Sequence, residues 1–263
     1  AEVKRWWSMV GKEWRGTWTL LAVSISATAA FDIWLGIKTA KWSLLHMGEG
    51  LALGLSSIPF AGVGIATVVA GYFAMRGEWQ SRTSMRTLSY PIGGTQLLTA
   101  KLAVILFNLV LVTIVASAGT WLVVNRTPGF REMMMTDPTF MAWLRSREFL
   151  TSGIWVTISA VLGIAFMIAV GMFSFVIGTL VPRVSGLIAV AAHVLMWYLC
   201  FAFGPHAMYI ASFLPNPVIV GFDNPLGLVR RLAVPLLPFW PTLAVTAVLL
   251  LVAGKILESE VDA

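Results

Sequence analysis

Few residues of this sequence have the types and spacing that catalysis requires. Glu78 and Arg82 have the E-x-x-x-R spacing of some intramembrane proteases. Those enzymes also need histidines in a matching helical pattern to activate water, and the histidines here are scattered at His46, His193 and His206. Neither H-E-x-x-H nor G-x-S-x-G occurs, so a zinc or serine hydrolase is unsupported. We therefore expect a chain that is not an enzyme and has no metal site.

The sequence also contains no phosphate-binding loop motif of the kind found in ATP-binding proteins. The Gly-Lys pairs at Gly11 and Gly254 lack the glycine-rich loop that cradles phosphate in ATP-binding proteins. The run Met133–Met135 could offer thioethers to a soft metal such as Cu(I), although packing and lipid contact explain it more simply. The single cysteine, Cys200, cannot form an internal disulfide. We expect that the chain binds no ATP and no cofactor by itself.

Composition indicates a membrane protein. Of the 263 residues, 58% are hydrophobic and 11% are charged, whereas soluble domains have about a quarter charged residues. Twelve Trp and fifteen Phe suit the aromatic belts of a bilayer protein. The net charge of +6 is better explained by loops that face anionic headgroups than by a nucleic-acid site. The expected partner is thus the lipid bilayer, and not a nucleic acid.

Six stretches reach the length of about 20 apolar residues that a transmembrane helix needs. They are Thr17–Ile37, Gly50–Met75, Leu102–Val124, Ile154–Val181, Leu187–Phe203 and Leu232–Ile256. We predict an all-α, polytopic membrane protein in which residues 17–256 form one six-helix transmembrane domain and residues 257–263 a C-terminal tail. Prolines at 235, 238 and 241 are expected to kink the last helix or delay its start.

Residues 1–16 have the pattern of an amphipathic helix. Apolar side chains recur on one helical face at Val3, Trp6, Trp7, Val10 and Trp14. Lysines and arginines occupy the opposite face, and such a helix lies flat in the headgroup region. We therefore predict an interfacial helix; the alternative is a basic flank that only orients the first span.

The dense basic N-terminus favours cytoplasmic N- and C-termini. In that orientation the cytoplasmic side carries ten of the eighteen Lys and Arg residues, so the total distribution decides little. Loop 76–101 is then cytoplasmic, and loops 125–153 and 204–231 are external. Because Gly204–Arg231 is moderately apolar and contains several prolines, we expect short re-entrant or interfacial helices there.

Loop 76–101 is the most informative segment. Residues 78–101 read EWQSRTSMRTLSYPIGGTQLLTAK, which is too polar and basic to insert into a membrane. Pro91 breaks the segment, because the residue before a proline avoids helical conformation. A second short helix, from Gln96 to Lys101, is expected to continue into the third span. The segment could lie on the membrane and offer a surface to another protein.

This segment resembles the loop after the second helix in the permease subunits of the ABC-2 type exporter family. In that family a Glu is followed by Gly-Thr, a Leu, a Pro and a Leu-rich run that ends in Lys. The positions that fit this order are Glu78, Thr83, Leu88, Pro91, Leu97, Leu98 and Lys101. The sequence departs at Arg82, where the family usually has Gly. Six spans and a basic amphipathic N-terminal helix also agree with the family.

The resemblance implies the membrane subunit of an ATP-driven exporter. Such permeases pair with a second permease subunit and sit on two copies of a separate ATPase, which binds ATP and Mg. The coupling residues implied are Glu78, Arg82, Thr83, Arg86, Leu88, Pro91 and Lys101. The charged members would contact the ATPase; the alternative is a solvated loop face. The alternative function is a secondary transporter or channel that works without ATP.

Polar residues within the apolar stretches are candidates for a transport path. Asp32 could serve in gating or substrate contact, or could simply reach the interface or a polar partner, because intramembrane carboxylates are costly. Asn108 and His193 are more simply explained as groups that form hydrogen bonds between helices. None of the three identifies a substrate.

Overall fold

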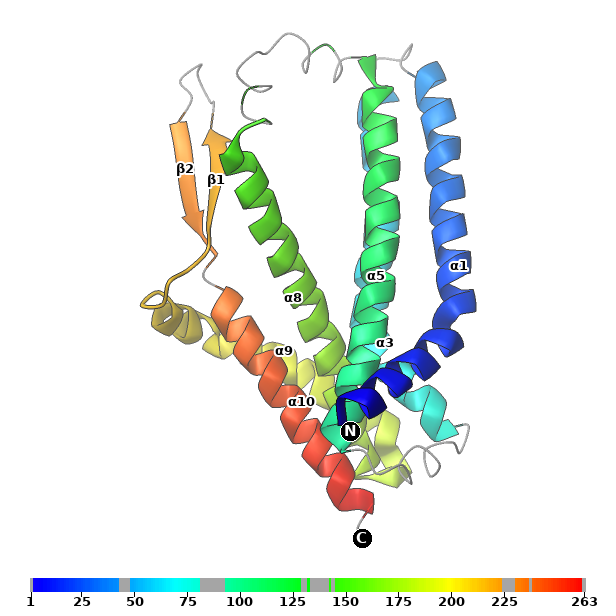
Figure 1. Ribbon diagram of the computed structural model, residues 1–263, viewed down its shortest axis with the longest axis vertical. Coiled ribbons are helices and arrows are strands. Elements are labelled where there is room, and N and C mark those ends of the chain that lie inside the picture. Colours follow the sequence, from blue (N-terminus) through cyan, green and yellow to red (C-terminus); the bar gives the residue numbers. More distant parts are fainter. Residues whose placement is uncertain are drawn as a thin grey trace. The chain divides into compact units, whose positions relative to one another are not determined.

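The computed structural model describes residues 2–42, 48–80, 93–128, 132, 142, 145–223, 230–236 and 238–261. Within these ranges, six helical segments are long and apolar enough to cross a membrane. They are Val3–Thr39, Gly50–Gly77, Gly94–Asn125, Arg147–Thr179, Pro182–Ala211 and Phe239–Ser259. The all-α prediction is confirmed, and the protein is by length and composition a multi-pass membrane protein (Figure 1).

The first three spans are built from four helices. α1 (Glu2–Trp42) joins the predicted interfacial segment to the first span in one element. Its 41 residues amount to about 60 Å of helix measured along the chain, about twice the thickness of the hydrocarbon core. α2 (Gly48–Ser56) and α3 (Ile58–Gln80) together form the second span, and α5 (Gly94–Asn125) forms the third.

Prolines lie near several ends of the last three spans. α8 (Arg147–Thr179) is followed by the short 3₁₀ helix η1 (Pro182–Val184) and by α9 (Ser185–Ala211). α9 continues past Pro205, because membrane helices tolerate an internal proline. α10 (Phe239–Val261) begins later than the predicted Leu232, so the expected delay by prolines is confirmed.

A β-hairpin lies between α9 and α10 (Figure 1). β1 (Val218–Asp223) pairs antiparallel with β2 (Arg230–Pro235). The prediction of short re-entrant or interfacial helices across Gly204–Arg231 is therefore wrong. The β-branched and aromatic run V-I-V-G-F at residues 218–222 favours extended backbone. The sequence prediction gave the prolines more weight than this run.

The helices belong to two compact units. The first comprises Ala1–Glu13, Thr67–Leu106 and Thr151–Ala263, and the second comprises Trp14–Ala66 and Phe107–Leu150. The first unit has its most continuous buried stretch in α8, from Ile168 to Val176 with one interruption at Phe173. The second has two small hydrophobic clusters, built on Leu21, Val63 and Val112 and on Leu35, Ala52 and Val123.

In the first unit, α3 and α8 approach each other through two glycines. A Cβ on Gly71 would overlap the backbone carbonyl of Ile168, and one on Gly171 would lie 3.0 Å from the backbone nitrogen of Tyr72. Next to this crossing, the rings of Tyr72 and Phe175 meet edge to face, with centroids 5.5 Å apart. Small residues permit such backbone contact between membrane helices. The crossing fixes the last turns of α3 against α8.

Replacing Gly71 tests this crossing. Gly71→Ala should lower the free energy of unfolding by about 1–3 kcal/mol, because the added methyl group forces the two backbones apart. The measurement is the thermal midpoint of the purified protein in detergent. Gly64→Ala on the same helix is the matched control, since a Cβ there meets no atom within 4 Å. Equal midpoints for the two variants would contradict the close crossing.

Candidate functional site

The predicted coupling segment ends at the start of α5, which we call the α5 junction: residues Gly93–Lys101 and the α1 and α10 side chains that hold them. All of these residues belong to the first unit. The backbone carbonyl of Gly93 accepts hydrogen bonds from the amides of Gln96 and Leu97, at 2.9 and 3.1 Å. These bonds begin the helix, which runs on without interruption into the third span. The expected helix from Gln96 to Lys101 is thus confirmed.

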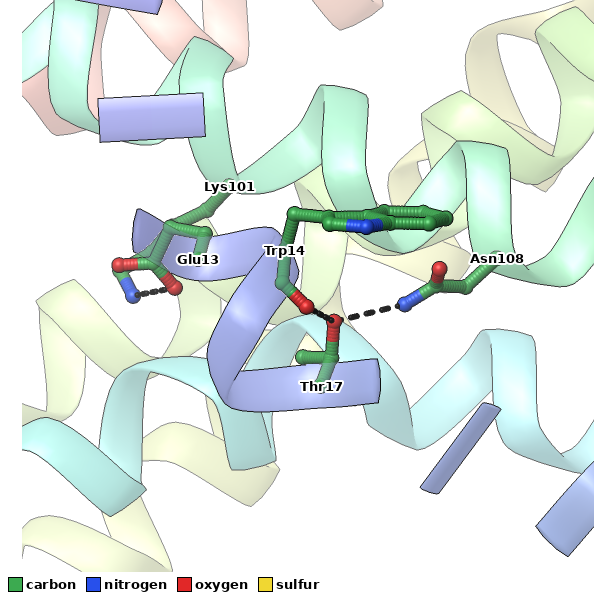
Figure 2. Close-up of polar contacts among 5 residues, drawn as sticks. All are labelled: Glu13, Trp14, Thr17, Lys101 and Asn108. Carbon is green, nitrogen blue, oxygen red and sulfur yellow. Dashed lines mark hydrogen bonds and ion pairs between the residues drawn. The ribbon is translucent and has the colours of Figure 1, made fainter. Parts of the chain in front are cut away.

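A buried ion pair joins α5 to α1 at this junction. Lys101 is only 2% exposed, and its Nζ lies 2.9 Å from Oε2 of Glu13 (Figure 2). The Glu13 side chain is 16% exposed. A buried ammonium group is tolerated only with a well-placed counter-charge, because it has lost its hydration. Lys101 is therefore buried against α1, and its role in coupling stays a prediction.

A second contact ties the same two helices together. The indole Nε1 of Trp6 donates a hydrogen bond to Oγ1 of Thr99 at 3.2 Å. Next to it, Met9 packs against Leu97 and Ala100 in a small buried cluster. Polar and apolar contacts thus hold the first turns of α1 against the first turns of α5.

Some side chains on the predicted apolar face of the N-terminal helix pack against the protein, and others are exposed. Trp6 and Val10 are half-buried and pack on the cluster of the α5 junction. Val3 and Trp7 are 71% and 62% exposed. Trp14, also half-buried, belongs to the second unit, where its ring lies 5.1 Å from that of Phe107. The exposed edge is the part left for the bilayer interface.

The C-terminal helix holds the α5 junction from another side. Oε1 of Glu258 accepts a hydrogen bond from the backbone amide of Gly94 at 2.6 Å. A carboxylate at this position caps the helix and interacts favourably with its dipole. The backbones also touch, since a Cβ on Gly94 would overlap the carbonyl of Gly254. The C-terminal end of α10 therefore lies beside the start of α5 (Figure 1).

In the second unit, α1 and α5 share further polar contacts. Nδ2 of Asn108 donates to Oγ1 of Thr17 at 3.0 Å, and that hydroxyl donates to the backbone carbonyl of Trp14 at 3.3 Å (Figure 2). Asn108 thus forms a hydrogen bond between two helices. The described bond of His193 lies within one helix: its Nε2 accepts a bond from Nε1 of Trp197, at 3.2 Å.

Asp32 is the most unusual of the predicted path residues. It is 2% exposed, and among the described residues neither carboxylate oxygen has a hydrogen-bond partner. The carboxylate lies against α5, since a Cβ on Gly119 would overlap it. Asp32 and Asn108 therefore both lie where α1 meets α5 in the second unit, whereas His193 belongs to the first unit.

Two of the predicted coupling residues, Glu78 and Lys101, lie within the described residues. Glu78 lies in the last turn of α3. The others, apart from Lys101, lie outside the described residues: Arg82, Thr83, Arg86, Leu88 and Pro91. The structure therefore describes the two ends of the predicted coupling segment, up to residue 80 and from residue 93.

Sequence reasoning missed the residues that hold the α5 junction, namely Glu13, Thr99, Gly254 and Glu258. One signal was available: a lysine at the start of an apolar stretch requires an acidic partner. However, the chain has twelve acidic residues, and spacing does not indicate that the partner lies 88 positions earlier.

The α5 junction joins three helices. Its polar groups are an ion pair, an indole donor with a hydroxyl acceptor, and a carboxylate cap. Comparisons with protein-family models, curated proteins and solved structures find no match for this chain. A functional interpretation therefore depends on these contacts and on the sequence pattern of the segment that leads into them.

A double-mutant cycle tests the ion pair. Lys101→Met and Glu13→Gln should each lower the free energy of unfolding by up to about 3 kcal/mol, because each removes one charge from an ion pair that is largely shielded from water. The double variant should lose clearly less than the sum of the two. Lys12→Gln, at the neighbouring exposed position, is the control and should not change unfolding in detergent. Additive losses would show that the pair does not stabilise the junction.

Proposed function

We propose that this chain is the membrane-spanning permease subunit of an ATP-driven exporter of the ABC-2 type. Two such subunits, identical or related, would form the translocation path. The observation that carries the proposal is that the segment with the family-like pattern, Arg76–Lys101, leads into a junction that fixes three helices together. This is the arrangement expected of a segment that transmits force.

The physical argument concerns stiffness. Displacing a loop moves a helical bundle only if the ends of the loop are attached more firmly than the loop itself. At one end, Lys101 is held by Glu13, and Gly94 by Glu258. At the other end, α3 is fixed against α8 by the crossing at Gly71. A displacement of the segment would therefore reach α1, α5, α8 and α10 together.

The chemistry would be divided between chains. Two copies of a separate ATPase would bind ATP and Mg, and Glu78, Arg82 and Arg86 would contact it from the cytoplasm. Lys101 would position the segment without touching the ATPase, since it is buried against Glu13. The same proposal includes the cell membrane as location and cytoplasmic N- and C-termini. ATP binding would drive transport only if the ATPase contacts differ between inward and outward states.

Charge-removing variants test the coupling contact. Glu78→Gln and Arg86→Gln should each weaken retention of the ATPase on the tagged, full-length chain by up to about fivefold, because each removes one charge from a polar interface. ATPase retained from the native membrane is quantified by mass spectrometry, with ATP-driven transport as the second measurement. Lys41→Gln, which alters an exposed lysine far along α1, is the control. Wild-type retention and transport in both variants would remove the assignment.

A secondary transporter is the second candidate, and Asp32 is the observation that favours it. A buried carboxylate within a membrane helix, without a described hydrogen-bond partner, is costly and is usually kept for ion or proton handling. Such a transporter would work without any ATPase. The two candidates differ in whether the isolated chain is active.

Flux measurements on the isolated chain separate the candidates. If the chain is a proton-driven transporter, proteoliposomes that contain it alone will show proton flux under an imposed pH gradient. Asp32→Asn should abolish this flux, because an amide cannot carry the proton. Thr28→Val, one turn earlier on α1, is the packing control. If the exporter proposal is correct, the wild-type chain alone will show no flux.

A further inference from the structure

A cavity of about 510 Å³ lies in the first unit, where three membrane helices end. Its walls come from α3, α8, η1 and α9 and consist of Tyr72, Arg76, Phe175, Thr179, Pro182, Ser185, Gly186 and Ala189. We propose that this cavity binds an anionic phosphate group, with the headgroup of a membrane lipid as the favoured source. The proposal does not depend on the exporter function.

The walls of the cavity lie at the ends of membrane spans. The second apolar span ends at Gly77, the fourth ends at Thr179, and the fifth begins at Pro182. Arg76 is thus at the end of one span, and the turn between the other two forms the opposite wall. Basic residues at span ends lie at the level of lipid phosphates, and basic pockets between membrane helices bind anionic headgroups.

The polar lining suits an anion. Arg76 is exposed and supplies a guanidinium group, which recognises phosphate through paired hydrogen bonds. The hydroxyls of Tyr72 and Ser185 are further donors, whereas that of Thr179 donates to its own helix at the carbonyl of Val176. None of the described lining residues is acidic. The described part of the lining therefore favours a negatively charged group.

The start of α9 adds to this attraction. α9 begins at Ser185, on the wall of the cavity, and its N-cap residue Val184 provides no side-chain cap. The N-terminus of a 27-residue helix carries partial positive charge and free amide groups, which favour phosphate. The helix start and the guanidinium group of Arg76 thus face the same space.

The remaining lining favours a lipid over a free anion. Phe175, Pro182 and Ala189 provide apolar surface next to the polar groups. A phospholipid presents the matching combination, an anionic phosphate attached to a glycerol and acyl chains. Inorganic phosphate would leave this apolar surface uncovered. The shared chemistry is the phosphate, and the two sources can be distinguished by experiment.

The test is native mass spectrometry of the purified full-length protein, titrated with phosphatidylglycerol, phosphatidylcholine or inorganic phosphate. Phosphatidylglycerol should bind more tightly than phosphatidylcholine. R76Q should weaken phosphatidylglycerol binding by about fivefold, while R76K should retain most of it. R183Q should behave as wild type, because Arg183 lies in the adjacent turn and does not line the cavity.

A second variant keeps the charge and changes the space. G186L places a large side chain on the cavity wall, at a position where a Cβ meets no atom within 4 Å, and should also weaken binding. If inorganic phosphate binds with the same dependence on Arg76 and phosphatidylglycerol has no advantage, the phosphate site is supported with a free anion as its source. The proposal is overturned if neither R76Q nor G186L weakens binding, or if phosphate and both lipids bind without any dependence on Arg76.

Discussion

An ammonium group at the start of an apolar helix requires a counter-charge, and Glu13 supplies it to Lys101 at 2.9 Å. This pair determines where the N-terminal turns of α1 must lie, because moving them away from α5 would separate the two charges in poorly hydrated surroundings. The indole bond from Trp6 and the cluster around Met9 form only when that placement is made. On the side of α10, Glu258 gives the same helix start a second carboxylate contact. The first unit is therefore organised around the beginning of α5.

The remaining helix contacts follow from the weak driving force for apolar association in lipid. Because acyl chains are as apolar as leucine, helices in a bilayer associate through close backbone packing and polar pairs. Both devices occur here: glycines at the α3–α8 and α5–α10 approaches, and the hydrogen bond from Asn108 to Thr17 between α1 and α5. Asp32 differs from Asn108, because it is buried against Gly119 without a described hydrogen-bond partner.

Function, as proposed, depends on the attachment of one polar segment to this scaffold. The segment from Arg76 to Lys101 has the pattern that resembles the ABC-2 family. It connects α3, which packs against α8 near Gly71, to α5, which is held against α1 by the Lys101–Glu13 ion pair. One end of the segment, at Arg76, also borders the cavity proposed to take a phosphate group.

The sequence by itself determined the membrane class, the six spans and the continuation of α5 from Gln96, because uninterrupted apolar length and helix breakers are local properties. It failed at the hairpin, where a β-branched run outweighed the expectation drawn from prolines. It also could not pair Lys101 with Glu13 or cap Gly94 with Glu258, which lies 164 positions away. Only the tertiary structure decided these two contacts, because the partner of a buried charge depends on which helices pack against each other. Helical periodicity in the sequence predicts which face of a helix is apolar, but not which helix will pack against it.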